Sequence, residues 1–416
     1  MLTRRGFMGG SALALSVPAR VRADTVQEVT IGALYPLSGA SAQVGVDAKA
    51  AFATAADIVN TPHPGLDLPL AKGEGLPGLG GAKARLIYAD HQGDPQKGRA
   101  EAERLITQEK VTALIGTYQS AVAAAVSQAA ERHAIPFMSA DNSSPSLHRR
   151  GLKYFFRAAA HDEMFSTVMF DFLDSLRKKG EKVETLALFY EDTIFGTDSS
   201  NIQRRLAGER GYKLVSDIKY RANTPSLATE VQQLKADNAD VLMPTSYTAD
   251  SILLVKTMSE LGYRPKAIIA QSAGFADRAF LDAVGSKIEN FITRGSFSLD
   301  LAQKRPSVAK VNELFKARSG KDLNDNTARE FMAMLVLADG INRAKSTEGS
   351  KIRDALAATN IPGSRTIMPW RKVVFEETGQ NPDADPVLLQ YSGGRFVTIF
   401  PEQVAVAKPV WPMSKS

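Results

Sequence analysis

The chain has 416 residues, of which 44% are hydrophobic and 23% are charged, and its lack of cysteine excludes disulfides, thiolate metal sites and cysteine nucleophiles. Its formal net charge of +6 falls to +2 beyond the first 23 residues, because Arg4, Arg5, Arg20 and Arg22 lie there and leave 47 basic and 45 acidic side chains. So small a net charge provides no general electrostatic attraction to nucleic acid, and we expect no nucleic-acid partner.

The first 23 residues are typical of an export signal. The paired arginines precede an apolar run, residues 7–17, that is far shorter than the ~20 residues of a membrane-spanning helix. Residues 3–7 (TRRGF) are similar to a twin-arginine signal, although Gly9 leaves the general secretory route open. We expect export to the periplasm, cleavage after Ala23 and a mature chain beginning at Asp24. No lipid anchor is expected, because the chain has no lipobox cysteine.

Beyond this signal, short β-branched runs alternate with longer alanine-rich helical patterns, which predicts βαβ units around parallel sheets. The first series of expected elements is strand 29–34, helix 43–60, strand 83–90, helix 95–108, strand 112–115, helix 120–133 and strand 135–139. The second series is helix 162–179, strand 185–190, helix 196–211, strand 213–220, helix 227–236, strand 241–243, helix 249–261 and strand 267–270. The mature 393 residues also exceed what one core usually holds, so two lobes are predicted.

Three more helical patterns follow, at residues 307–319, 325–345 and 349–358, and then strand-like residues 373–375 and 396–400. Their periodicity does not assign them to a lobe. Residues 61–82, rich in glycine and proline, stand where a short turn would suffice, and we expect a surface flap of unassigned function.

Three patterns that could indicate a cofactor or catalysis have simpler explanations. Residues 73–78 (GEGLPG) match the dinucleotide-binding fingerprint, but that fingerprint has meaning only between a strand and a helix, and here it lies in a loop. The five histidines lack metal-ligand spacing, and neighbouring carboxylates such as Glu101 and Glu103 are typical of solvated faces. No set of nucleophile, base and orienting group can be assembled, so we expect no cofactor, no metal and no enzymatic activity.

Several segments, in their order and spacing, resemble the leucine/isoleucine/valine-binding protein family, the type I periplasmic binding proteins that serve ABC importers. The resemblance covers nearly all of the mature chain. It is carried by residues 31–39 (IGALYPLSG), Asp90 to Pro95, Ile115-Gly116 with Ser120, residues 135–139 (IPFMS) with Pro145, and Tyr190-Glu191-Asp192 with Phe195-Gly196.

The resemblance implies an α/β protein of two doubly wound lobes, the type I periplasmic binding protein fold. Three hinge crossings are implied near residues 158–162, 294–298 and 363–367. The expected division is a signal at 1–23, a first lobe of 24–160 with 297–364, a second lobe of 161–296 with 365–400, and a tail at 401–416.

The ligand site is expected where the loops follow the strands, because open α/β sheets bind ligands at the carboxyl ends of their strands. There Ser120 would offer an anion its hydroxyl and a helix N-terminus. The resemblance implies that Ser120 and Ser143 hold a ligand carboxylate and that the carbonyl of Asn142 faces an amino group. It further implies that the second lobe contributes Phe195, Ser246 or Tyr247, and residues near Ser272. The serines as helix caps and Phe195 as plain core remain alternatives.

Two departures from the family bear on the ligand. Family members that bind amino acids place an acid near Ser272 to pair with the ammonium, but residues 271–274 (QSAG) contain none, and Val44 stands where an aromatic often covers the ligand. An amino acid, an amide, a carboxylic acid or another small polar organic molecule therefore all remain possible ligands.

The function expected from these features is a monomeric solute-binding protein that captures its ligand by hinge closure and delivers it to the permease of an ABC importer. A ligand-sensing subunit for a membrane receptor is the first alternative. A secreted α/β enzyme is the second, and the missing catalytic set disfavours it.

Overall fold

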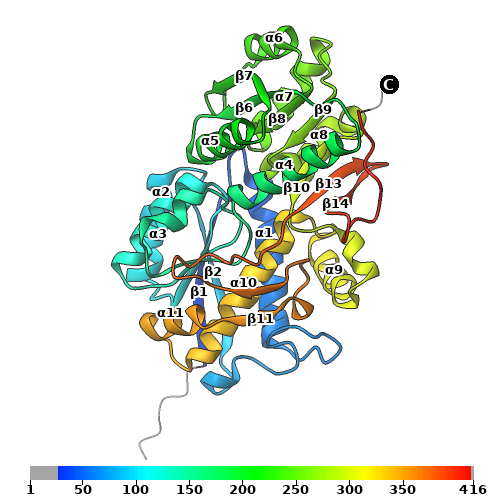
Figure 1. The fold of residues 1–416 in the computed structure, drawn as a ribbon. Helices are drawn as coiled ribbons and strands as arrows, with labels where there is room; N and C mark the ends of the chain where they lie inside the picture. The colour runs from blue at the N-terminus through cyan, green and yellow to red at the C-terminus, as the bar shows by residue number, and fades with distance from the viewer. Residues whose placement is uncertain (1–26, 414–416) are drawn as a thin grey trace, which may run out of the picture.

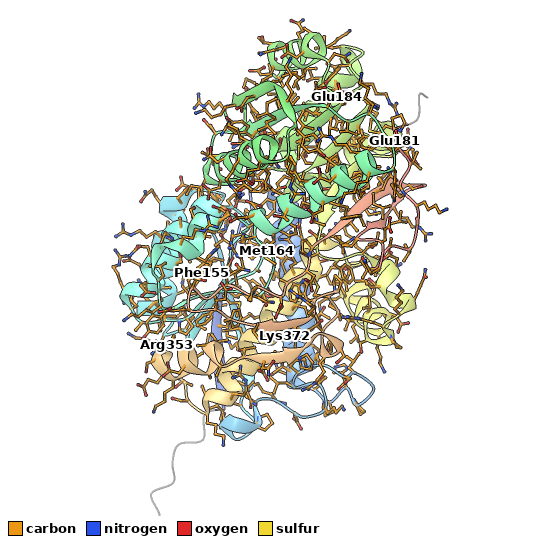
Figure 2. The ribbon with its side chains drawn as sticks, in the orientation of Figure 1. Phe155, Met164, Glu181, Glu184, Arg353 and Lys372 are labelled. Carbon is orange, nitrogen blue, oxygen red and sulfur yellow. The ribbon has the colours of Figure 1, made fainter. Side chains whose placement is uncertain are left out.

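The computed structural model describes residues 27–413 and shows two α/β lobes, one above the other in Figure 1. The expected export signal and its cleavage site lie outside the described residues. Figure 2 shows Glu181, Glu184 and Lys372, all exposed, among the charged side chains that cover the surface, whereas Phe155 is buried within. No helix between residues 27 and 413 is long and apolar enough to cross a membrane.

The first lobe is built on a five-stranded parallel sheet in the order β2-β1-β3-β4-β5. Its strands are β1 (Glu28–Tyr35), β2 (Lys83–Asp90), β3 (Ala113–Gly116), β4 (Phe137–Ser139) and β5 (Phe155–Arg157). Its helices are α1 (Ala42–Asn60), α2 (Pro95–Thr107) and α3 (Ser120–Arg132), joined by the later α9 (Pro306–Ser319), α10 (Asp325–Ala344) and α11 (Gly349–Ala357).

Helices α1 and α10 cover one face of this sheet, and α2 and α3 cover the other (Figure 1). Strand β1 shows why, because successive side chains of a strand point to opposite faces. Ile31 and Ala33 are buried in the core beneath α1 and α10, and Leu34 is buried beneath α2 and α3. Helix α2 begins at Pro95, behind the N-cap Asp94, whose carboxylate accepts two backbone N–H groups of the first turn.

The second lobe is built on a seven-stranded sheet in the order β14-β13-β10-β9-β8-β6-β7. Strands β6 to β10 are parallel to their neighbours among themselves, and β13 and β14 run antiparallel at one edge. The strands are β6 (Thr185–Glu191), β7 (Lys213–Tyr220), β8 (Val241–Thr245), β9 (Ala267–Ala270), β10 (Ile292–Gly295), β13 (Val387–Ser392) and β14 (Arg395–Phe400). Helices α4 (Asp162–Lys178) and α5 (Ile194–Glu209) cover one face, and α6 (Ala228–Asp237), α7 (Thr248–Glu260) and α8 (Arg278–Val284) cover the other. The predicted fold class of two doubly wound lobes is confirmed.

The third crossing differs from its expected place. Residues 365–384 were expected in the second lobe, but several of them are buried in the first-lobe core, among them Ile367, Met368, Trp370, Val373 and Ala384. Strand β12 (Lys372–Val374) pairs with β11 (Asn360–Pro362), and the side chain of Asn381 donates to the carbonyl of Ala158 at 2.9 Å. Because this segment buries its apolar side chains against the first lobe, we propose that the third crossing lies at about residues 382–386.

Residues 61–82 are more than the surface flap expected from their glycine and proline content. Leu66, Leu68 and Leu76 are buried in the first-lobe core. The backbone N–H of Gly78 donates to the side chain of Asn342 on α10 at 2.7 Å. Residues 61–82 therefore pack against the first lobe beside α10, because their spaced apolar side chains are buried in the core of that lobe.

The tail beyond β14 packs along the second lobe. The ring of Trp411 lies 6.1 Å from that of Phe172 on α4, and the N–H of Met413 donates to the carbonyl of Lys266 at 3.0 Å.

Candidate functional site

A small cavity lies where the carboxyl ends of the parallel strands of the two lobes face each other. From the first lobe it is lined by Tyr118, Ser120, Asp141 and Ser143 after β3 and β4 and by Asn326 and Arg329 on α10; from the second lobe it is lined by Phe195, Tyr247, Ala273 and Arg294. Only about 10 Å³ is open to the centre of a water-sized sphere, which is room for about one water molecule. The two lobes are thus closed around this site.

Four of the seven residues expected to bind a ligand meet here. The backbone N–H of Ser120, the first residue of α3, donates to the hydroxyl of Tyr247 at 3.2 Å. The hydroxyl of Ser143 accepts from Nη2 of Arg294 at 3.3 Å. The rings of Phe195 and Tyr247 are 5.1 Å apart. Both hydrogen bonds join the first lobe to the second.

Asn142 is not among the side chains that line the cavity. Its Oδ1 accepts from the N–H of Thr117 at 3.0 Å, and its carbonyl accepts from Nη1 of Arg157 at 3.0 Å. The carbonyl that was expected to face an amino group is therefore occupied within the first lobe, and Asn142 links the loops after β3 and β4.

Ser246 and Ser272 are also absent from the cavity lining. The hydroxyl of Ser246 accepts from the hydroxyl of Tyr220 at 2.7 Å, within the second lobe. The N–H of Ser272 donates to the hydroxyl of Thr293 at 3.2 Å. Each loop instead presents a neighbour to the cavity, Tyr247 in one case and Ala273 in the other.

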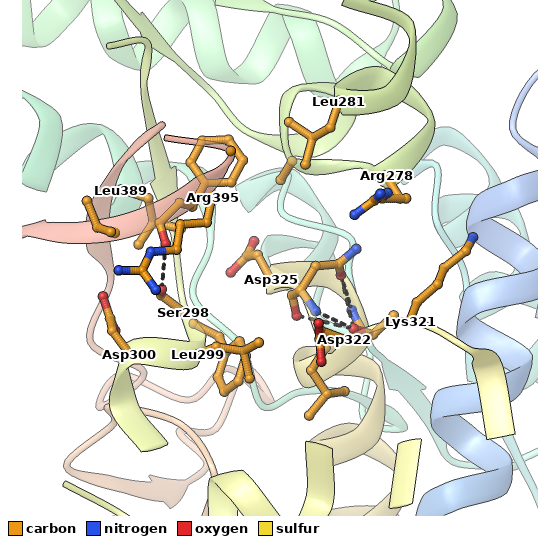
Figure 3. A pocket seen from close by; sticks show the side chains of 18 of the residues that line it. Arg278, Leu281, Ser298, Leu299, Asp300, Lys321, Asp322, Asp325, Leu389 and Arg395 are labelled. Atoms are coloured by element: carbon orange, nitrogen blue, oxygen red, sulfur yellow. Dashed lines mark hydrogen bonds between the residues drawn. The ribbon is translucent and has the colours of Figure 1, made fainter. Parts of the chain in front are cut away.

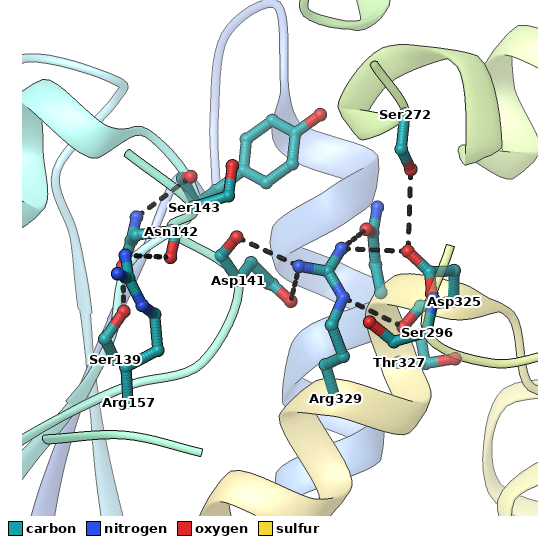
Figure 4. Close-up of polar contacts among 12 residues, drawn as sticks. Ser139, Asp141, Asn142, Ser143, Arg157, Ser272, Ser296, Asp325, Thr327 and Arg329 are labelled. Carbon is teal, nitrogen blue, oxygen red and sulfur yellow. Dashed lines mark hydrogen bonds and ion pairs between the residues drawn. The ribbon is translucent and has the colours of Figure 1, made fainter. Parts of the chain in front are cut away.

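Asp141, in the polar segment that follows β4, and Arg329 on α10 were not among the residues expected to bind the ligand, but they form a polar cluster that lines the cavity (Figure 4). Nη1 of Arg329 donates to the carbonyl of Asp141 at 3.0 Å, and Nη2 of Arg329 forms an ion pair with Asp325 at 3.1 Å. The carboxylate of Asp141 accepts from the hydroxyl of Tyr35 at 2.6 Å. Each nitrogen of the Arg329 guanidinium thus has a partner within its own lobe.

Burial controls the charge of this cluster. It raises the pKa of the Asp141 carboxyl, and it raises that of the neighbouring Glu330 well above the usual value, with the charge of Asp141 as the next cause. The positive charge of Arg329 opposes the shift of Asp141. The hydrogen bond between the two carboxyls lowers the pKa of Asp141 and raises that of Glu330, so a proton held by this pair lies on Glu330 rather than on Asp141, which faces Arg329.

The third charged residue of the cavity is Arg294, on β10 of the second lobe. Its side chain is 1% exposed, and its guanidinium carbon lies 3.8 Å above the ring centre of Phe165. Burial lowers the pKa of Arg294 to about 10, so the side chain remains positively charged at neutral pH.

Asp277 joins the lobes next to the cavity. Its carboxylate accepts from the hydroxyl of Tyr118 at 3.1 Å and from Nδ2 of Asn326 at 2.5 Å, both from the first lobe, and also from the hydroxyl of Thr248. Burial raises the pKa of Asp277 to about 7, although the hydrogen bonds from Thr248 and Tyr118 oppose the shift.

A second contact between the lobes lies outside the cavity lining. Asp198 on α5 accepts from the backbone N–H of Ser146 at 3.1 Å and from the hydroxyl of Ser144. The side chain of Asp198 is half-buried. We call this contact the Asp198 clasp.

A larger cavity of about 570 Å³ lies between α8 of the second lobe, the α9–α10 connection of the first, and the β13–β14 hairpin (Figure 3). Its charged side chains are of both signs, and several are already paired: Lys321 lies 3.2 Å from Asp47, and Arg278 lies 2.9 Å from Asp282. Both lobes line this space, so its width depends on the angle between them.

The small cavity offers hydrogen-bond donors, the polar cluster of Asp141 and Arg329, and aromatic walls, but none of its lining residues is a histidine, the commonest general base. The buried His148 packs against the half-buried His161 and lies beside Arg157, and burial lowers the pKa of His148 to about 3. Among residues 27–413, no group of three or more histidine or acidic side chains could hold a metal ion. The chemistry supported by this arrangement is binding of a small polar molecule between two lobes.

Comparisons with known proteins agree with this arrangement. A profile of the family described as "Periplasmic binding protein" matches residues 28–395. Leu/Ile/Val-binding protein homolog 8 of Brucella abortus is 30% identical over 413 residues, covering 96% of this chain and 97% of the relative.

Two solved structures share the fold. A leucine binding protein, LivK, from Thermotoga maritima superposes with a TM-score of 0.76 at 20% identity, over 89% of this chain and 97% of that one. A solute binding protein of an ABC transporter from Rhodopseudomonas palustris, in complex with 3,4-dihydroxy benzoic acid, superposes with a TM-score of 0.74 at 16% identity, over 94% of this chain and 100% of that one.

Proposed function

The chain belongs to the periplasmic binding protein family, and on that premise we propose that it captures a small polar organic molecule in the periplasm and delivers it to the permease of an ABC importer. One protein of the same fold is a leucine binding protein and another binds 3,4-dihydroxy benzoic acid, which supports a small organic ligand. A single chain contains both halves of the site, and we propose that it acts as a monomer.

The observation that carries this proposal is the enclosed cavity to which both lobes contribute side chains. A ligand held there gains contacts from the second lobe only when the lobes close. Its differential affinity for the closed form then shifts the population toward closure. The closed shape is the signal that a permease would recognise.

Within the cavity we propose that Ser120, Ser143, Phe195 and Tyr247 contact the ligand. The two serines supply a hydroxyl each, and Ser120 adds the N-terminus of α3. The rings of Phe195 and Tyr247 exclude water from the closed site. Asn142, Ser246 and Ser272 would act by positioning the loops.

The direct test combines binding with shape. The protein is purified without refolding, any bound compound is identified by mass spectrometry after denaturation, and that compound is returned to stripped protein. Calorimetry should find one site per chain, and small-angle scattering should show a smaller radius of gyration with ligand. Chemical conversion of the compound by pure protein would instead support a secreted enzyme.

Export is tested separately. We propose that a twin-arginine signal directs the chain to the periplasm, so N-terminal sequencing of the mature protein should begin at Asp24. Replacing the paired Arg4 and Arg5 by lysine should retain the protein in the cytoplasm. Unchanged export of that variant would favour the general secretory route.

A further inference from the structure

Arg294 is a buried cation with most of its hydrogen-bonding capacity unused. Of its five N–H donors, one from Nη2 reaches the hydroxyl of Ser143 at 3.3 Å, while Nε and Nη1 have no hydrogen-bond partner among the described residues. The nearest carboxylates, Asp162 at 3.8 Å and Asp325 at 4.0 Å, lie beyond hydrogen-bonding distance.

The other two fully buried arginines near the cleft are different. Arg157 donates to Gln380 at 2.7 Å, to the carbonyl of Ser144 at 2.9 Å and to two further acceptors. Arg329 is paired with Asp325 and hydrogen-bonded to the carbonyl of Asp141. A buried polar group without a partner is destabilising, and native structures rarely keep one without a reason. Of these three arginines, only Arg294 both lines the cavity and has guanidinium nitrogens without a hydrogen-bond partner.

The surroundings of Arg294 hold its guanidinium in one orientation. One face stacks on the ring of Phe165, and Nη2 is fixed by Ser143 across the lobe interface. A guanidinium that is fixed in this way is preorganised to bind a planar acceptor. A carboxylate suits it best, because its two oxygens can accept from two adjacent N–H groups of the guanidinium at once.

We propose that Arg294 is the anion anchor of this site and that the ligand is a small organic carboxylate, whose charged group accepts from the unused donors of Arg294 of the second lobe, next to Ser143 of the first. This inference rests on the proposed function and deepens it by naming the ligand class. The carboxylate is then the group that couples binding to closure, because it needs donors from both lobes at once.

The test uses pairs of compounds in which the carboxylate is replaced by the neutral primary amide of similar shape. L-Leucine and 3,4-dihydroxybenzoate are each titrated beside their primary amides into the wild-type chain by calorimetry, together with any compound recovered from the purified protein by mass spectrometry. Loss of one hydrogen bond to a charged group corresponds to about a 10- to 100-fold rise in Kd. We expect a carboxylate to bind at least about 10-fold more tightly than its amide.

Two substitutions and a matched control then assign that preference. Arg294→Gln should raise the Kd of the carboxylate by about 10- to 100-fold and reduce its preference over the amide, and Arg294→Lys should lie between because it keeps the charge but loses the planar fork. Arg204→Gln is the control, since Arg204 on α5 pairs with Asp217 at 2.7 Å at the surface. Melting temperatures without ligand show whether each variant is folded. If Arg294→Gln does not fold, the Kd values of Arg294→Lys decide the test.

The outcomes separate the two proposals. A recovered compound without an anionic group, or an Arg294 variant that binds the carboxylate as tightly as the control does, overturns the anion anchor and leaves solute binding intact. A wild-type chain that retains no compound and binds no member of the panel counts against the proposed function itself.

Discussion

The Asp198 clasp allows closure to be weakened without touching the ligand, because Asp198 lies outside the cavity lining. Asp198→Ala removes two hydrogen bonds that exist only when the lobes are together, one from the N–H of Ser146 at 3.1 Å and one from the hydroxyl of Ser144. Hydrogen bonds to a charged acceptor are worth about 1.5 to 3 kcal/mol when buried. This carboxylate is half-buried and regains water when the cleft opens, so we expect about 1 to 2 kcal/mol for the pair.

A loss of that size raises the Kd by about 5- to 30-fold. The increase should appear mainly as faster dissociation, because differences between related complexes lie mostly in the off-rate. Calorimetry gives the Kd and stopped-flow measurement gives the rates, both with the compound identified from the purified protein. Asp217→Ala is the matched control, since Asp217 pairs with Arg204 within the second lobe. If Asp198→Ala and the control bind with the same Kd and off-rate, the clasp does not stabilise the closed form.

Three further predictions concern the cavity, pH and the core. Ser120→Ala should raise the Kd by about 10- to 100-fold with little change in melting temperature, and a loss of about 1 kcal/mol of stability at unchanged Kd would indicate a helix cap instead. Because burial raises the pKa of Asp277 to about 7 in the closed form, closure should take up a proton, and affinity should fall, by at most about tenfold per pH unit, as pH rises toward 7. Asp277→Asn should flatten that dependence, and a profile as steep as that of the wild type would assign the proton to another group, such as Glu330. Phe52→Ala, at a fully buried position of the first-lobe core, should lower the free energy of unfolding by about 3 to 5 kcal/mol, and chemical denaturation would contradict this if the loss were below about 1 kcal/mol.

The sequence predicted the long parallel strands and the helices of the described residues, except the seven-residue α8, because their periodicity is strong. Helix α10 begins at the predicted residue, and β2 has the predicted bounds. The missed strands are short or irregular: β5 has three residues, and β10 has four, Ile-Thr-Arg-Gly, with no alternation. Strand β13 lies next to the edge strand β14 and pairs only with antiparallel neighbours, so the alternation of strands and helices that indicates βαβ units did not predict it.

The same weakness explains which site residues were missed. Ser120 and Ser143 follow predicted strands of the first lobe, so the position of the sheet edge was enough to suggest them. Arg294 lies on β10, which was not predicted, and nothing in its local sequence separates it from a surface arginine. Arg329 stands four residues after Asp325, a spacing typical of an exposed helical ion pair, and only the fold shows that both are buried.

The larger cavity between α8, the α9–α10 connection and the β13–β14 hairpin suits the protein to optical sensing. Val406, which lines this cavity, is 40% exposed, and the chain contains no other thiol with which a dye could react once Val406→Cys is introduced. A fluorophore attached there would sit in a space whose walls belong to both lobes, while the ligand cavity keeps its own lining. Its emission should follow the angle between the lobes, and so report ligand concentration in real time.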